Sequence, residues 1–210
     1  MKIAVLDNGP GYLRHVYRAE RSPGHEFSLV PALKLAQTDL APFDVFVAPN
    51  GTDHVALFAS REKIRTFLDD GGIVMCFCGW VTDWIPRARW RMSTDIPLRT
   101  YAIAAPDPRH PLLAGVDLAE VNVTPEGKRG FWACGHIEVG PGADVLMTDN
   151  RGRCVMFVDE KTTSGAVIAT ASGPLPGFGD DGVAFDRLFD NALEWSERKR
   201  AHARARRVEA

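Results

Sequence analysis

"FDVFVAPNGTDHVALFASREKIRTFLDDGGIVMCFCG", residues 43–79, contains an apolar run, an amphipathic stretch and a second apolar run in succession. The first run is apolar at residues 45–47 without alternation, as in a central parallel strand that is buried on both faces. The middle stretch has apolar residues at helical spacing, Thr52 or Asp53 as a candidate N-cap, and a Gly pair at its end. The second run, "IVMCFC", predicts another strand. These residues therefore predict one βαβ unit.

Apolar runs bounded by Gly, Pro and Asn alternate with amphipathic segments in the rest of the chain. The patterns predict strands at 2–9 and 26–33, a short helix at 12–21 and a closing helix at 183–200. Residues 80–98 have no sustained period and predict a long irregular loop, which is typical of a lid or binding loop. Further strands are predicted at 99–105, 131–139, 143–149, 154–160 and 165–172.

The order of these elements predicts the fold class. Alternating strands and helices in the first half favour a layered α/β domain with a parallel sheet. The later strands follow one another without helices between them, so several of them are expected to pair antiparallel. We therefore predict a flavodoxin-like three-layer α/β sandwich, whose mainly parallel sheet has antiparallel additions in the C-terminal half.

Length and composition define the broad class of the protein. The chain has 210 residues, 45% hydrophobic and 25% charged, which predicts one globular domain over residues 1–198. A basic, frayed tail is expected at 199–210. The formal net charge of -2 gives no field that would attract nucleic acid or an anionic membrane, and no apolar stretch is long enough to cross a bilayer.

The same features predict the compartment and the partners. No secretory signal is visible, so we expect a cytoplasmic protein whose four cysteines are reduced. We expect a small-molecule ligand as partner, and neither nucleic acid nor a membrane; a homo-oligomer is compatible with the sequence. No Gly-x-Gly-x-x-Gly or Walker pattern is present, and no cofactor is expected.

Four motifs in order resemble the ThuA-like (trehalose utilisation) branch of the class I glutamine amidotransferase-like superfamily. They are "FDVFVAPNG", "FLDDGGIVMCFCG", "RHPLLAGV" (109–116) and "FDRLFDNALEW" (185–195). The resemblance implies that residues 1–198 form a single domain of this type. It also implies where a catalytic nucleophile would lie, because amidotransferases have a Gly-x-Cys-x-Gly elbow on a sharp strand-to-helix turn.

This chain departs from the catalytic pattern of the family. Aligning the last glycine of the elbow with Gly79 puts Phe77 at the nucleophile position, where ThuA-like relatives tend to have His. The triad histidine of the family follows the last core strand, and "ATASGPLPGFGDDG" (169–182) contains no histidine. Glutamine amidotransferase activity is therefore not expected.

Candidate site residues lie at the carboxyl ends of the predicted parallel strands, where ligands bind in open α/β sheets. Of these, His54 and Asp53 are the candidates for acid/base chemistry. The alternatives are that Asp53 only caps a helix, that His54 is only a solvated residue of its first turn, that Asn50 and Gly51 only shape a turn, and that the tryptophans only hold the loop on the core. The predicted ligand-binding residues are Asp7, Asn8, Asn50, Phe77, Cys78, Gly79, Trp80, Asp83 and Trp84.

Cys76 and Cys78 are one residue apart, so in an extended strand their side chains share one face and Phe77 lies on the other. Two sulfurs could begin a zinc site if Cys134 and His136 approached them. Packing in the core is the favoured alternative, because free cysteine is among the most buried residue types. We predict no metal.

Two hypotheses of function follow. The first is a ThuA-like domain that binds, and could transform, a small polar or carbohydrate-like ligand at the carboxyl edge of the sheet. The second is a catalytically degenerate amidotransferase-like module that senses a ligand or binds a protein. Neither hypothesis decides whether the chain is an enzyme.

Overall fold

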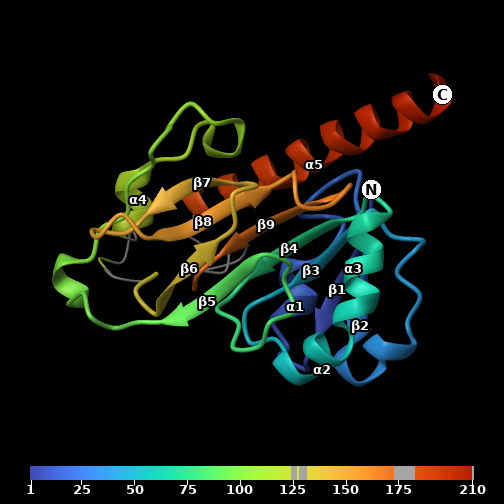
Figure 1. Ribbon diagram of the computed structural model, residues 1–210, viewed down its shortest axis with the longest axis horizontal. Coiled ribbons are helices and arrows are strands. Elements are labelled where there is room, and N and C mark those ends of the chain that lie inside the picture. Colours follow the sequence, from blue (N-terminus) through green and yellow to red (C-terminus); the bar gives the residue numbers. More distant parts are fainter. Residues whose placement is uncertain (124–126, 128–131, 173–182, 210) are drawn as a thin grey trace.

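The computed structural model describes residues 1–123, 127, 132–172 and 183–209. In these residues nine strands form one sheet in the order β2-β1-β3-β4-β9-β8-β6-β5, with β7 paired to β8 (Figure 1). The strands at the β2 end are parallel and those at the β5 end are antiparallel. The predicted α/β class with a mixed sheet is confirmed.

Five strands make up the parallel part of the sheet. Every residue of β3, β4 and β9 is buried, which explains why their sequences are apolar without alternation. The helical segments that connect β1 to β4 include α1 (Leu13–Val16), η1 (Ala32–Gln37), α2 (His54–Ala59) and α3 (Arg61–Asp69). The parallel strands are β1 (Lys2–Asp7), β2 (Glu26–Pro31), β3 (Val45–Ala48), β4 (Ile73–Phe77) and β9 (Ala166–Thr170).

The antiparallel part comes from the second half of the chain, as predicted. β8 pairs antiparallel with β9, β7 and β6, and β5 pairs antiparallel with β6. Close spacing along the chain allows these strands to be joined without crossover helices. They are β5 (Ala88–Met92), β6 (Gly135–Val139), β7 (Ala143–Thr148) and β8 (Cys154–Asp159).

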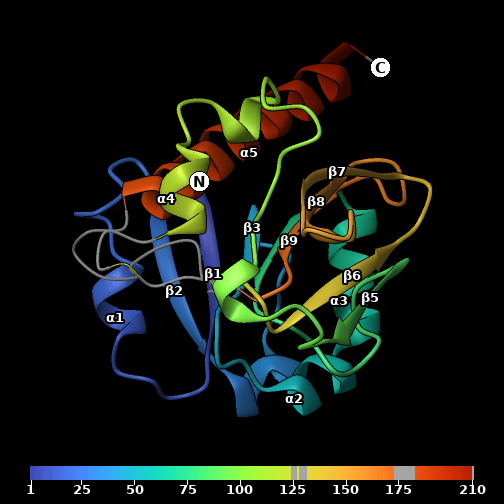
Figure 2. The same cartoon turned by 90° about the vertical axis from the view of Figure 1, so that its left-hand side faces the viewer.

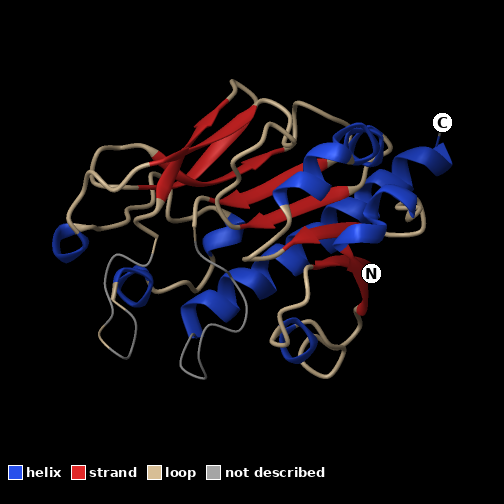
Figure 3. Ribbon diagram, turned by 90° about the horizontal axis from the view of Figure 1, so that it is seen from below, coloured by secondary structure: helices blue, strands red, loops and turns tan. Residues whose placement is uncertain are grey.

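Helices cover both faces of the parallel strands, which completes three layers (Figures 2 and 3). The closing helix α5 (Val183–Glu209) packs through Phe189, whose ring lies against Tyr17 near α1 and against Phe77 of β4. α3 lies on the opposite face and buries Ile64, Phe67 and Leu68. Three short segments complete the description: η2 (Leu98–Thr100), η3 (Pro111–Leu113) and α4 (Leu118–Asn122).

Two motifs that are distant in sequence meet beside α5. His110 Nδ1 accepts a hydrogen bond from the amide of Leu112 at 3.2 Å and so holds the turn that begins η3. Asn191 Nδ2, from the closing helix, donates to the carbonyl oxygens of Leu112 and Ala114 at 3.1 and 2.9 Å. The "RHPLLAGV" and "FDNALEW" segments therefore form one structural unit.

Two predicted helices differ from the observed ones. The predicted helix at 12–21 is wrong beyond Val16, because Tyr17 leaves helical geometry and buries its ring between Phe27 and Phe189. The single amphipathic stretch after β3 is two helices, since Ser60 departs from helical geometry between α2 and α3.

Two predictions in the middle of the chain are also wrong. Residues 80–98 are not irregular throughout, because β5 lies within them and pairs with β6. Residues 99–105 are not a strand and form only an isolated bridge from Ala104 to Thr148. The amides of Ala102 and Ile103 instead donate to side-chain oxygens of Asn150 and Asn122, at 2.6 and 2.5 Å, so they are not available to a strand ladder. The predicted strand at 131–139 begins at Gly135, and residue 131 lies outside the described residues.

α5 continues through the segment that was expected to fray, and Figure 1 shows its end projecting past the sheet. Lys199 Nζ lies 3.0 Å from Glu160 Oε2. Arg200 Nη2 lies 2.8 Å from Asp44 Oδ1, and Arg200 Nη1 donates to the carbonyl oxygen of Gly71 at 2.9 Å. In the described part of the chain, no helix has the length and apolar character needed to span a membrane.

Candidate functional site

The carboxyl ends of β1 and β3 are joined by hydrogen bonds between the loops that follow them. Asn8 Nδ2 donates to the carbonyl oxygen of Gly51 at 3.1 Å. The hydroxyl of Tyr12 donates to the carbonyl oxygen of Asn50 at 2.6 Å. Asp7 Oδ1 accepts from the amide of Gly9 at 2.7 Å and so shapes its own loop. The structure therefore brings these predicted residues to one edge of the sheet, the edge at which ligands bind in open α/β sheets.

Asp53 and His54 begin α2 directly beyond β3. Asp53 Oδ1 accepts from the amides of Val55 and Ala56 at 2.9 and 3.0 Å, which is the helix-capping role considered as an alternative. Burial lowers the pKa of His54, although the neighbouring Asp53 carboxylate acts in the opposite direction. The His54 ring is therefore neutral at pH 7, and its buried Nδ1 has no hydrogen-bond partner.

Phe77, the residue aligned with the family nucleophile, belongs to the core. Its side chain is 0% exposed, and its ring meets that of Phe189 edge-on, with centroids 6.0 Å apart. β4 leads into a loop and then β5, so no strand-to-helix turn is present at this point. Among the described residues other than glycine, a left-handed φ occurs only at Arg87. The strained backbone of a nucleophile elbow is therefore absent from Phe77 and Cys78.

The two cysteines flanking Phe77 share a face, as expected. Cys76 Sγ and Cys78 Sγ lie 3.9 Å apart, and burial raises the pKa of the Cys76 thiol well above its usual value. Cys134 is exposed, whereas Cys76 and Cys78 are buried. No group of three or more His, Cys, Asp or Glu side chains in the described residues could hold a metal ion, so the zinc alternative has no support there.

The tryptophans of the loop after β4 pack inward. Trp80 is 1% exposed and Trp84 is 3% exposed, which favours the alternative that they hold the loop on the core. Position 79 requires glycine, because a Cβ atom there would lie 2.4 Å from the Trp90 ring. Asp83 points outward and pairs with Arg89 at 2.8 Å. Of this loop's predicted site residues, only Asp83 is exposed at the surface.

Several buried polar atoms on the loops after β3 and β4 have no hydrogen-bond partner. The hydroxyl of Thr82 donates to the carbonyl oxygen of His54 at 3.1 Å and ties these two loops together. A buried polar atom without a protein partner costs about 1–3 kcal/mol unless a water molecule or a ligand supplies the hydrogen bond. The atoms without a partner on these loops are Thr52 Oγ1, His54 Nδ1, Trp80 Nε1 and Trp84 Nε1.

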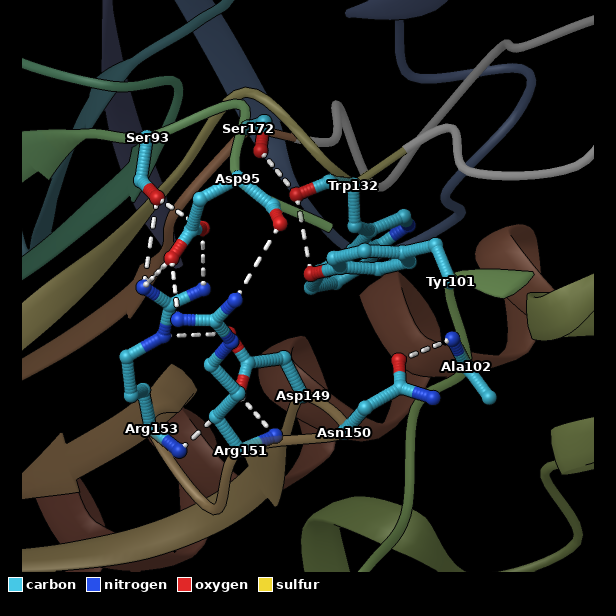
Figure 4. Close-up of polar contacts among 10 residues, drawn as sticks. All are labelled: Ser93, Asp95, Tyr101, Ala102, Trp132, Asp149, Asn150, Arg151, Arg153 and Ser172. Carbon is cyan, nitrogen blue, oxygen red and sulfur yellow. Dashed lines mark hydrogen bonds and ion pairs between the residues drawn. The ribbon is translucent and has the colours of Figure 1, made fainter. Parts of the chain in front are cut away.

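The sequence did not predict a polar network that lies in the antiparallel half of the sheet (Figure 4). Asp149, whose side chain is 1% exposed, accepts from the amides of Arg151 and Arg153 at 2.8 and 3.0 Å. Both arginines also pair with Asp95, Arg151 at 2.6 Å and Arg153 at 2.9 Å. Hydrogen bonds from Arg153 and Ser93 lower the pKa of Asp95. The Asp-Asn-Arg-Gly turn at 149–152 was the available signal, because such residues favour tight turns.

The two arginines of this network balance the charges of its two aspartates. Because Asp95 lies in the loop after β5 and the arginines lie between β7 and β8, the ion pairs tie these two segments together. Beside it, the carbonyl oxygen of Trp132 accepts from the hydroxyl groups of Tyr101 and Ser172, at 3.1 and 2.6 Å (Figure 4). Burial raises the pKa of Tyr101 well above its usual value, so it is protonated at neutral pH. Because Ser172 follows β9, these bonds fix the segment before β6 at the carboxyl end of the central strand.

Comparisons with known proteins bear on the fold. No family model matches the chain, and no curated protein matches it. Two cytoplasmic proteins of Salmonella typhimurium, STM3548 and STM1381, superpose with a TM-score of 0.63 at 14% and 13% identity, covering 92% of this chain and 98% of theirs. A Thermoplasma acidophilum protein described as a "putative gmp synthase subunit a protein" has a TM-score of 0.64 at 15% identity, covering 97% of this chain and 98% of its own. At these identities the likeness shows a shared fold alone.

Proposed function

We propose that this chain is a ThuA-like domain of the glutamine amidotransferase-like superfamily that binds a small polar, carbohydrate-like ligand at the carboxyl edge of its parallel strands. The observation that carries the proposal is the meeting of the polar loops after β1 and β3 at that edge, where Asn8 bonds to Gly51 and Tyr12 to Asn50. Hydroxyl groups both donate and accept hydrogen bonds, so a polyhydroxylated ligand can pair with carboxylate, amide and imidazole groups at this edge. The four sequence motifs and the fold shared with the Thermoplasma protein support the family assignment.

Glutaminase chemistry is not part of the proposal. Phe77 has no nucleophilic atom, its ring is fully buried, and the backbone after β4 does not form a strand-to-helix turn. If the ligand is transformed, His54 is the candidate general base, because the lowered pKa leaves its ring neutral and able to accept a proton. Asp53 is the second candidate, although its Oδ1 already accepts two amides of α2.

A second candidate function is a protein-binding or ligand-sensing module without catalysis. The observation that favours it is the exposure of apolar side chains on and beside α2. Val55 is 77% exposed, Phe58 is 41% exposed, and Leu33, on the neighbouring η1, is 91% exposed. Exposed apolar groups that gather in this way mark interaction surfaces in many proteins.

A ligand screen tests the first function. Thermal unfolding of the full chain would be followed with neutral sugars, sugar acids and small carboxylic acids. A ligand present at about 100 times its Kd stabilises the folded state by about 2.7 kcal/mol, which is a measurable rise in Tm. We expect His54→Ala to remove this rise, and Asn8→Ala, which deletes an exposed amide of the loop after β1, to reduce it.

His202→Ala is the matched control for His54→Ala, because His202 is exposed on α5 and belongs to neither loop. It should leave the ligand-dependent rise in Tm unchanged. The proposal fails if no compound of these classes raises Tm, or if His54→Ala keeps the full rise. Ammonia release from glutamine should stay at the level of a blank reaction throughout.

A further inference from the structure

Cys76 and Cys78 bring two sulfur atoms together at the end of β4. Their Sγ atoms are 3.9 Å apart, and Cys76 Sγ donates to the carbonyl oxygen of Cys78 at 3.6 Å. Residues i and i+2 of a straight strand are about 6.6 Å apart along its axis. β4 ends at Phe77 and the chain bends at Cys78, which accounts for the closer approach of the two sulfurs.

We propose that Cys76 and Cys78 form a reversible disulfide when the protein meets a peroxide, which makes the end of β4 a redox modification site. A disulfide has an S–S length of about 2.05 Å, so the two sulfurs must move about 2 Å closer, chiefly by side-chain rotation at the bend. The other two cysteines lie on other parts of the fold, Cys154 on β8 and Cys134 just before β6. Cys154 Sγ donates to the carbonyl oxygen of Met156 at 3.4 Å, and Cys134 is exposed in the segment before β6.

The two thiols have different roles in the reaction. Cys78 is 4% exposed and Cys76 is 0% exposed, so the peroxide reaches Cys78 first. Burial raises the pKa of Cys76, which keeps it a thiol until a reactive sulfur lies beside it. Cys78 is therefore the residue that is oxidised, and Cys76 is the residue that resolves it.

The steps balance with one peroxide molecule. Hydrogen peroxide transfers one oxygen atom to the Cys78 sulfur, which gives a sulfenic acid and one water molecule. The Cys76 sulfur then attacks the Cys78 sulfur, the S–O bond breaks, and the leaving hydroxyl group takes the Cys76 proton as a second water molecule. Two thiols lose two electrons in total, and the peroxide is reduced by two electrons.

The site borders the loops described above but does not depend on a ligand. Burial and, second, the electrostatic interaction with Cys78 raise the pKa of Tyr12. The Tyr12 hydroxyl holds the carbonyl oxygen of Asn50. Disulfide formation is measured on the sulfur atoms themselves, so it can succeed or fail whether or not a carbohydrate-like ligand binds.

Mass spectrometry of the oxidised full chain tests the proposal. The reduced protein is treated with a small molar excess of hydrogen peroxide, blocked with N-ethylmaleimide and digested with trypsin, which releases residues 66–87 as one peptide with both cysteines. We expect this peptide to lose the mass of two hydrogens and to regain it with dithiothreitol. A chain with Cys134→Ser and Cys154→Ser should behave identically.

Single variants separate the two roles. Cys76→Ser should leave a sulfenic acid on Cys78 that dimedone traps, and Cys78→Ser should leave Cys76 unmodified. The proposal is overturned if the wild-type peptide stays a dithiol while circular dichroism shows a folded protein, if Cys78 advances to sulfinic acid without pairing, or if the disulfide appears only in denaturant. The wild-type measurement decides the question even where a serine variant does not fold.

Discussion

Replacing Phe77 with alanine tests whether the end of β4 belongs to the core or to a ligand site. The ring is 0% exposed and contacts Phe189 edge-on at 6.0 Å between centroids. Trimming it removes about 120 Å² of buried apolar surface, which at about 25 cal/mol per Å² corresponds to about 3 kcal/mol. Loss of the aromatic contact adds about 1 kcal/mol. We therefore expect Phe77→Ala to lower the free energy of unfolding by about 4 kcal/mol, inside the usual range for such changes.

Urea unfolding followed by circular dichroism measures this loss by linear extrapolation. Phe58→Ala is the matched control, because the Phe58 ring is 41% exposed on α2 and should cost less than half as much. A loss below about 1.5 kcal/mol for Phe77→Ala, with an unchanged dependence on urea, would refute the assignment of the ring to the core. It would return Phe77 to the candidate ligand-binding residues.

Three further predictions concern packing, protonation and the end of α5. A Cβ on Gly165 would lie 1.9 Å from the carbonyl oxygen of Gly72, so Gly165→Ala should cost more than about 2 kcal/mol in urea unfolding, while Gly11→Ala, with open space around it, should cost nothing measurable. Ending the chain after Arg198 deletes Arg200, the ion-pair partner of Asp44, whose side chain is 90% buried. This truncation should lower the free energy of unfolding by about 2–4 kcal/mol. Ending the chain after His202 keeps the ion pair and should lower it less. Burial lowers three histidine pKa values from 6.5, so the unfolded chain binds these protons more tightly and the urea midpoint should fall as pH drops from about 7.5 to about 5.5. That fall should shrink when all three are replaced by glutamine: His25, His54 and His136.

The βαβ unit at 43–79 could be predicted because its signals are local. An all-apolar run and helical spacing report the burial of each residue directly, and β3 and β4 are fully buried as expected. The break at Ser60 could not be predicted with the same ease, since Ser is tolerated within helices and the interruption depends on how α2 packs against its neighbours. Short-range pattern therefore found the elements but not the point that divides α2 from α3.

Elements that depend on distant partners were harder to predict. β5 contains Arg89 and Arg91, which pair with Asp83 and Glu138 at the surface, and its central Trp90 packs on Gly79 from another strand end. None of those contacts is visible in a five-residue pattern. Conversely, residues 99–105 look like a strand, but two asparagine side chains from far along the chain satisfy their amides. Long-range hydrogen bonds decided both cases.

The candidate site divides in the same way. Strand ends could be located from the sequence, so Asp7, Asn8, Asn50 and Asp53 lie on the expected edge. The sequence did not predict the direction in which each side chain points. Trp80 and Trp84 were expected at a ligand surface, but their side chains are only 1% and 3% exposed, and a local pattern does not report this burial.

β9 is translated late but occupies the centre of the sheet, which affects how the chain folds during synthesis on the ribosome. Residues 166–170 supply the parallel partner of β4 and the antiparallel partner of β8 at the same moment. Until they emerge, the nascent chain holds a fully apolar strand at 73–77 with one edge uncovered, the kind of edge that recruits other chains. Vectorial folding of this protein therefore leaves the sheet unfinished until β9 emerges, and α5, whose Phe189 covers Phe77 on one face, follows only after it.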